Sequence, residues 1–153
     1  MGAPYPVLTL YRYFAWADAM RENYEVARAR DIPRIEEAKA EGKFYPYHLA
    51  MHAEMYMCYW FSTLQIVIEG WPQLKYNDPR LKELLRSPHK RLLQKFRNAI
   101  FHPSDWMDTR INELVQKGQE SYDWVTAVTD AYRAFFASTR ELDEKLGMEG
   151  KVD

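Results

Sequence analysis

The chain has 153 residues, of which 47% are hydrophobic and 28% charged, and its net charge is −1. This length and composition predict one globular domain over residues 1–153, and they exclude wholesale disorder and a global positive field for nucleic acid. The single cysteine, Cys58, excludes a disulfide scaffold and a cysteine-based zinc site within one chain. Because Cys58 lies in an apolar run, we expect its thiol to be buried and inert.

The first third of the chain has the spacing of an amphipathic helix. Residues 7–30 place apolar side chains among charges at helical intervals. The segment 31–33 (DIP) interrupts this pattern, and Pro33 is expected to open a short helical continuation. Gly42 then ends that piece. We therefore expect two helical pieces before residue 43.

A second helix is expected from Pro46 to Glu69, where the segment 70–72 (GWP) stops it. It is apolar on most faces and should lie centrally in the domain. Its most apolar run, 55–68, is too short to span a bilayer. The chain also begins without the basic and apolar regions of a secretory signal, so we expect a cytoplasmic protein with no membrane partner.

The second half of the chain predicts four further helices and no strand. No segment alternates with period two for long enough to indicate a strand. Asn77 or Asp78 is expected to cap a short helix, and Pro103 to end the helix that follows. The fold class is therefore all-α, a helical bundle of four main helices plus short extra helices. The four helices of the second half are expected over 79–86, 88–101, 106–117 and 121–146.

The helix expected over 88–101 carries two polar residues that lie outside its core-facing stripe. At about 100° per residue, one stripe of the helix faces the core, and Arg97 lies at the margin of that stripe. Asn98 lies roughly opposite, toward solvent or a second subunit. His102 follows at the helix end, where Pro103 disfavours helical geometry and turns it into an extended conformation. The core-facing stripe consists of Leu92, Leu93, Phe96 and Ile100.

The approach to this helix end is locally basic. Between residues 80 and 97 there are seven Lys or Arg residues and one acidic residue, Glu83. Such a patch can engage phosphates even on a neutral protein, although most charge runs are solvated helix faces. The candidate RNA-binding residues on the helix are Lys90, Arg91 and Lys95.

The motif RNAIFH at 97–102, followed by a proline, resembles the R-x(4–6)-H motif of the HEPN superfamily. In that superfamily the residue after the arginine is commonly Asn, Asp or His, and the motif lies near the end of the third main helix of a small bundle. The resemblance rests on the motif, its position and the size of the bundle. It implies a single HEPN-like helical domain.

The resemblance also implies a function. HEPN domains typically act as metal-independent endoribonucleases, without a cofactor, at a composite site between two subunits of a homodimer. Carried over, Arg97 would bind the scissile phosphate, His102 would move protons and Asn98 would hold the geometry or supply a neutral donor. RNA is then the expected partner. A toxin or defence system is the implied setting, with a regulatory or antitoxin partner.

A metal-binding bundle is the first alternative. His48 and His52 are four residues apart and share one helix face, as in the paired ligands of the DinB-like family. His89 or His102 would have to supply a third ligand, because Glu54 points away from the pair. Core or interface histidines are the simpler interpretation, and no metal is predicted.

The second alternative is a catalytically inactive HEPN-like module that binds a partner or acts as a scaffold. RNAIFH would then be an ordinary helix end. Exposed aromatic residues would make the contacts, with Trp71, Trp106 and Trp124 as candidates. For most of these tryptophans, packing in the core is the simpler interpretation.

Overall fold

The computed structural model describes residues 6–43, 47–104, 109–139, 142 and 144, with only the backbone described for residues 6 and 47–50. This part of the chain contains helices and no strand, which confirms the all-α bundle. The elements are α1 (Pro6–Ala40), α2 (Tyr47–Gly70), the short 3₁₀ helix η1 (Trp71–Leu74), α3 (Pro79–Leu84), α4 (His89–Phe101), α5 (Thr109–Val115) and α6 (Gln119–Ser138).

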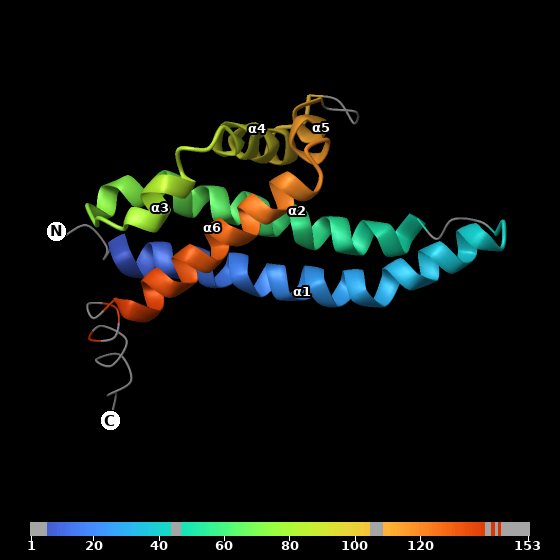
Figure 1. Ribbon diagram of the computed structural model, residues 1–153, viewed down its shortest axis with the longest axis horizontal. Coiled ribbons are helices and arrows are strands. Elements are labelled where there is room, and N and C mark those ends of the chain that lie inside the picture. The colour runs from blue at the N-terminus through green and yellow to red at the C-terminus, as the bar shows by residue number, and fades with distance from the viewer. Residues whose placement is uncertain (1–5, 44–46, 105–108, 140–141, 143, 145–153) are drawn as a thin grey trace.

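Helix α1 is continuous through Pro33, so the prediction of two separate helical pieces was wrong. A proline inside a helix removes one backbone hydrogen bond and bends the helix, but the packing of its neighbours can hold it in place. Asp31 and Ile35 are both buried on either side of Pro33, and the last part of α1 is tilted from the rest (Figure 1). Gly42 ends the helix as predicted, with φ +64° and the Lys43 N–H bonded to the carbonyl oxygen of Ala38.

Most other predicted helix boundaries lie close to the observed ones. Asp78 caps α3 by accepting the N–H of Leu81 at 2.9 Å. The last helix differs most, because α6 ends at Ser138 where Thr139 turns extended, whereas the sequence predicted a helix to 146. Thr139 holds this end by donating its hydroxyl to the carbonyl oxygen of Phe135 at 2.8 Å. The predicted helix start at 106 lies outside the described residues.

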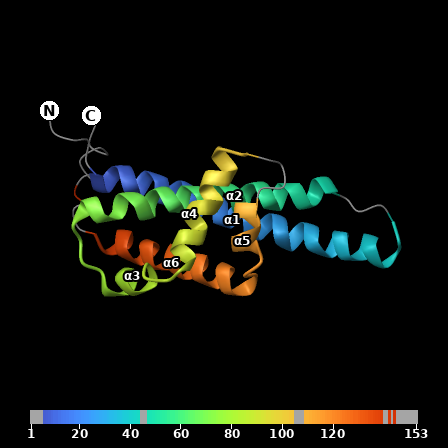
Figure 2. The same ribbon diagram turned by 90° about the horizontal axis from the view of Figure 1, so that it is seen from above.

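The two long helices α1 and α2 run antiparallel along the longest axis, and α6 crosses beside them (Figure 1). Seen from above, α4 runs across α2 rather than along it (Figure 2). The end of α4 therefore meets two different stretches of α2.

The core is dominated by aromatic and branched side chains from α1, α2 and α6, with two further residues from α4. Leu93 and Phe96 of α4 are fully buried, and Leu92 and Ile100 pack against the core, as the predicted stripe requires. Trp71 and Trp124 are also buried, so core packing holds for both and neither is available as a contact residue of the scaffold alternative; Trp106 lies outside the described residues. Within the described chain, none of the helices combines the length and apolarity needed to cross a bilayer.

Candidate active site

The end of α4 exposes the imidazole of His102. The backbone of His102 has φ −131° and ψ 66°, so it has left the helical region directly before Pro103, as predicted. Its N–H donates to the carbonyl oxygen of Asn98 at 2.8 Å, and its carbonyl oxygen accepts from Nη2 of Arg110 at 3.0 Å. Two backbone contacts therefore hold the position of His102 while its side chain faces solvent.

Arg97 lies one and a half turns before His102 and is held by α2. Its Nη2 donates to Oε1 of Glu69 at 2.5 Å, and Nε2 of Gln65 donates to the same oxygen at 3.1 Å. The Arg97 side chain is 23% exposed. Its Nε atom is buried and has no hydrogen-bond partner among the described residues. The guanidinium is thus fixed at one edge by a carboxylate and has its Nε turned inward.

The structure brings Arg97 and His102 to one end of one helix without joining them. Among the hydrogen bonds of the described residues, none connects the two side chains; Arg97 reaches Glu69, and His102 faces solvent. Asn98, between them, is half-buried rather than fully exposed. A single protomer therefore presents a guanidinium and an imidazole five residues apart at one helix end, held by different partners.

The outward side of α4 carries the predicted RNA-binding residues. Lys90 and Arg91 are exposed on the first turn. Lys95 lies further round the helix and donates to Oε2 of Glu113 at 2.8 Å, so its charge is partly neutralised by α5. The exposed basic side chains thus lie toward the start of α4, and the motif lies at its end.

An apolar patch lies beside the motif, and sequence reasoning did not single it out. It consists of the exposed residues Met51, Met55, Tyr59 and Phe101. Met55, Tyr59 and Phe101 also line a surface cavity of about 240 Å³ together with Cys58 and Ile100. The available signal was the four-residue spacing of 51, 55 and 59 on one face of α2, combined with Phe101 lying off the core stripe of α4.

The described residues do not assemble the metal site of the first alternative. His89 is buried, its Nδ1 lies 2.8 Å from Oγ of Ser87, and its ring stacks on Trp124. Its Nε2 lies 3.3 Å from Oε1 of Glu120, outside hydrogen-bond alignment. His52 is exposed, and the side chain of His48 lies outside the description. No group of three or more potential metal ligands occurs among the described side chains.

Cys58 is not an activated nucleophile. It is half-buried, and burial, with a smaller contribution from the Glu54 charge, raises the pKa of its thiol to about 12. The thiolate that would be needed for nucleophilic attack is therefore almost absent at neutral pH.

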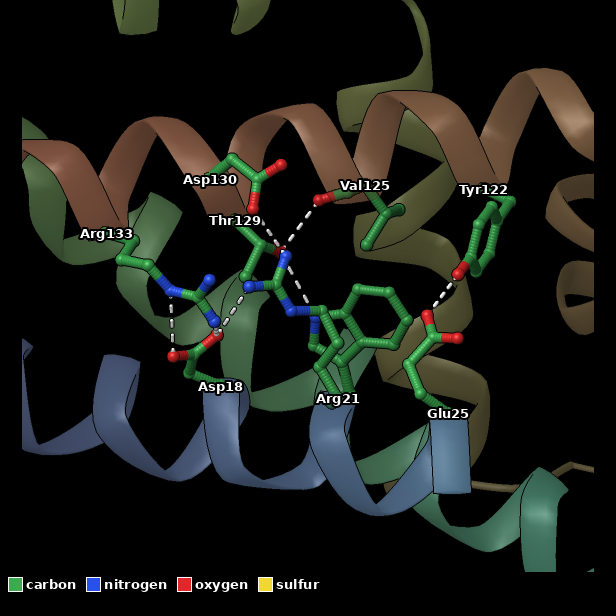
Figure 3. Close-up of polar contacts among 9 residues, drawn as sticks. Asp18, Arg21, Glu25, Tyr122, Val125, Thr129, Asp130 and Arg133 are labelled. Carbon is green, nitrogen blue, oxygen red and sulfur yellow. Dashed lines mark hydrogen bonds and ion pairs between the residues drawn. The ribbon is translucent and has the colours of Figure 1, made fainter. Parts of the chain in front are cut away.

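A second polar cluster, the α1–α6 seam, connects α1 to α6 (Figure 3). Arg21 is buried and donates to Asp130 at 2.6 Å and to Asp18 at 2.9 Å. Arg133 donates to both oxygens of Asp18. Farther along the seam, the Tyr122 hydroxyl bonds to Glu25, and burial and this bond raise the Tyr122 pKa to about 12. Both arginines of the seam face aspartates, which is the pattern of a structural contact.

A second cavity, of about 290 Å³, lies beside the α1–α6 seam. Tyr24, Arg28 and Tyr122 are among its lining residues, and the Arg28 guanidinium lies 5.5 Å from the centre of the Tyr122 ring. The four motif and basic residues Lys90, Arg97, Asn98 and His102 do not line it. The candidate active site at the end of α4 is therefore separate from this cavity.

Comparisons with protein-family models, curated proteins and solved structures found no significant match to this chain. The functional argument therefore rests on the residues themselves and on the resemblance of RNAIFH to the HEPN motif.

Proposed function

We propose that the protein is a metal-independent endoribonuclease of the HEPN type. The observation that carries this proposal is the end of α4, where an exposed imidazole follows a fixed guanidinium by five residues. An imidazole changes its charge near neutral pH and can move protons, and a guanidinium binds phosphate through several N–H donors. These are the two groups that RNA cleavage without a metal requires.

The reaction is an attack of the ribose 2′-oxygen on the neighbouring phosphorus. The bond from phosphorus to the 5′-oxygen breaks as the bond to the 2′-oxygen forms, which leaves a 2′,3′-cyclic phosphate and a 5′-OH. In this scheme Arg97 stabilises the negative charge that builds on the phosphate oxygens. Asn98 supplies a neutral donor from its side chain, or it holds the backbone of His102 through its own backbone carbonyl oxygen.

Two copies of the chain are needed to complete this site. The 2′-OH loses a proton and the leaving 5′-oxygen gains one, so the reaction needs a base and an acid. One protomer presents a single imidazole at the end of α4. A two-fold homodimer with the two α4 ends facing each other supplies His102 twice, and one can act as base while the other acts as acid.

The apolar patch supports such a dimer. Met55 is 44% exposed, Tyr59 51% and Phe101 49%, and they line one surface cavity, with Phe101 directly before His102 in the chain. Contiguous exposed apolar side chains commonly mark a protein–protein interface. Docking a second copy on this patch would bury it and bring the two motifs to one cleft. RNA would approach along the exposed Lys90 and Arg91 of each copy.

The test is cleavage of a mixed-sequence RNA in the presence of EDTA, followed by analysis of the product ends. We expect a 2′,3′-cyclic phosphate and a 5′-OH, and we expect DNA of the same sequence to survive because it lacks the nucleophile. Cleavage that stops in EDTA, or products with a 5′-phosphate, would contradict the proposed mechanism. A toxin or defence setting, with a regulatory or antitoxin partner that restrains the nuclease, belongs to the same proposal.

The inactive scaffold is the second candidate, and one observation favours it. Arg97 is paired with Glu69 in the free protomer, which neutralises the charge that should meet the phosphate. A folded, dimeric protein that cleaves no RNA, alone or with cell extract, would support this candidate instead.

A further inference from the structure

The contact between Arg97 and Glu69 is the least expected feature of the candidate site. Glu69 lies on the last turn of α2 and its side chain is 40% exposed. We propose that Glu69 is a positioning residue, which fixes the guanidinium of Arg97 for the scissile phosphate. This inference rests on the ribonuclease function proposed above and adds a residue that the RNAIFH motif does not contain.

The donors of Arg97 are divided between the protein and a ligand. A guanidinium has five N–H donors. Nε is turned inward and buried, and Nη2 points to Glu69. Nη1 and the second proton of Nη2 remain for a phosphate. Glu69 therefore orients the plane of the guanidinium without using all of its donors.

The side chain of Glu69 is itself held by another residue of α2. Gln65 is one helical turn earlier, is 2% exposed, and donates to Oε1 of Glu69 at 3.1 Å. A buried amide has little freedom to move, because the core surrounds it. The contacts from Gln65 to Glu69 and from Glu69 to Arg97 thus restrict the movement of the Arg97 side chain relative to α2.

A carboxylate beside Arg97 could also block phosphate binding, and the expected effects of the two roles differ. If Glu69 only neutralised Arg97, it would weaken RNA binding, and its removal should lower the KM for RNA. A positioning contact acts on the chemical step, because small displacements of a group that stabilises charge lower the rate steeply. An arginine side chain that is not packed in the core can adopt many rotamers. Its contact with Glu69 restricts these rotamers when the protein folds, so this entropy is not lost during the reaction. We therefore expect the loss of Glu69 to lower kcat and to leave KM nearly unchanged.

The experiment compares Glu69→Ala and Glu69→Gln with the parent protein, using RNA cleavage rates below the melting temperature. Glu69→Ala is expected to lower kcat about 10- to 100-fold with little change in KM. Glu69→Gln keeps an oxygen acceptor for Nη2 and should recover most of kcat. Glu83→Ala is the matched control, because Glu83 on α3 makes an exposed ion pair with Arg86, and it should change neither constant. An unchanged or increased kcat in Glu69→Ala would overturn the proposal.

A second readout separates this inference from the proposed function. The Nε–H of Arg97 is buried, so its NMR signal, assigned by its loss in Arg97→Lys, should be protected from solvent exchange in the parent. Glu69→Ala should remove that protection, and Glu69→Gln should retain it. If the parent cleaves no RNA, the proposed function fails on that result. Protection that persists in Glu69→Ala would overturn the positioning role whether or not RNA is cleaved.

Discussion

The α1–α6 seam and the end of α4 both bring arginine and carboxylate side chains together, but the two regions differ in how the arginines are paired. In the seam, Arg21 contacts two aspartates and Asp18 contacts two arginines. At the end of α4, Arg97 contacts one glutamate, its Nε has no partner among the described residues, and an exposed histidine lies close by.

This difference in arginine pairing suggests a way to separate polar residues that stabilise the fold from those proposed to act in the site. In the seam, each arginine is bonded to aspartate between two helices, so its charge is already neutralised within the protein. An arginine with spare donors, fixed beside an exposed titratable side chain, is arranged as catalytic groups are. The following predictions test whether the two regions separate stability from activity.

The largest expected effect is on His102. His102→Ala should lower RNA cleavage about 10²- to 10⁴-fold, because it removes the group that moves protons. The melting temperature should stay the same, since the imidazole is exposed. The matched control is His52→Ala, which removes an exposed histidine from α2 and should cleave like the parent. Equal cleavage by a folded His102→Ala protein would remove the catalytic assignment.

Arg97→Lys should lower cleavage by about 10²-fold or more, as the loss of one preorganised donor does in other enzymes. An ammonium group can replace the charge of the guanidinium but not its planar set of donors. Steady-state kinetics and thermal unfolding measure the two effects separately. If Arg97→Lys retains full kcat, the guanidinium is not the group that stabilises the transition state.

Met55→Glu should separate the dimer, because it places a charge in the apolar patch beside the motif. Light scattering should then report the mass of one chain, and cleavage should fall with the dimer population. The control is Val26→Glu on α1, where an apolar side chain is 65% exposed outside the patch. A parent protein that is monomeric at working concentration would contradict the composite site.

Arg21→Met should produce the opposite result from the motif variants. It leaves Asp130 without its arginine in a part-buried contact and should lower the free energy of unfolding by about 2–3 kcal/mol. The melting temperature should fall by about 5–10 °C for a chain of this size. Below that temperature kcat should match the parent. A large loss of kcat in folded Arg21→Met would break the distinction between the two regions.

Lys90→Ala is expected to have the smallest effect. Lys90 is exposed at the start of α4, so its removal should weaken RNA binding without changing the chemistry. The slope of log K against log salt should become shallower by about 0.7, the value for one phosphate contact on a single strand. Binding titrations at several salt concentrations measure this slope. An unchanged slope would place the RNA path elsewhere.

The local features of the fold could be read from the sequence because they depend on neighbouring residues. Asp78 before Pro79, Gly42 after α1 and Pro103 after His102 each act on their own turn of backbone. Pro33 was misread because tertiary packing around Asp31 and Ile35 keeps the helix continuous. The end of α6 was placed too late because Thr139, where the helix ends, is not a strong stop signal in sequence.

The candidate site could be found in part. The motif residues and the position of His102 follow from local sequence, since one helix and one proline determine them. The contact between Glu69 and Arg97 could not be predicted, because it depends on the crossing of α4 over α2 (Figure 2). The apolar patch depends on the same crossing, which places Phe101 beside Met55 and Tyr59.

The most direct test of the central claim, that two chains share one site at their α4 ends, is a mixing experiment. Parent protein and His102→Ala are unfolded together, refolded so that subunits combine at random, and assayed for RNA cleavage at several ratios. If each site needs His102 from both chains, activity falls as the square of the parent fraction, to about a quarter at equal amounts. Activity that falls in proportion to the parent fraction, to about half, would show that each chain acts alone and would contradict the account.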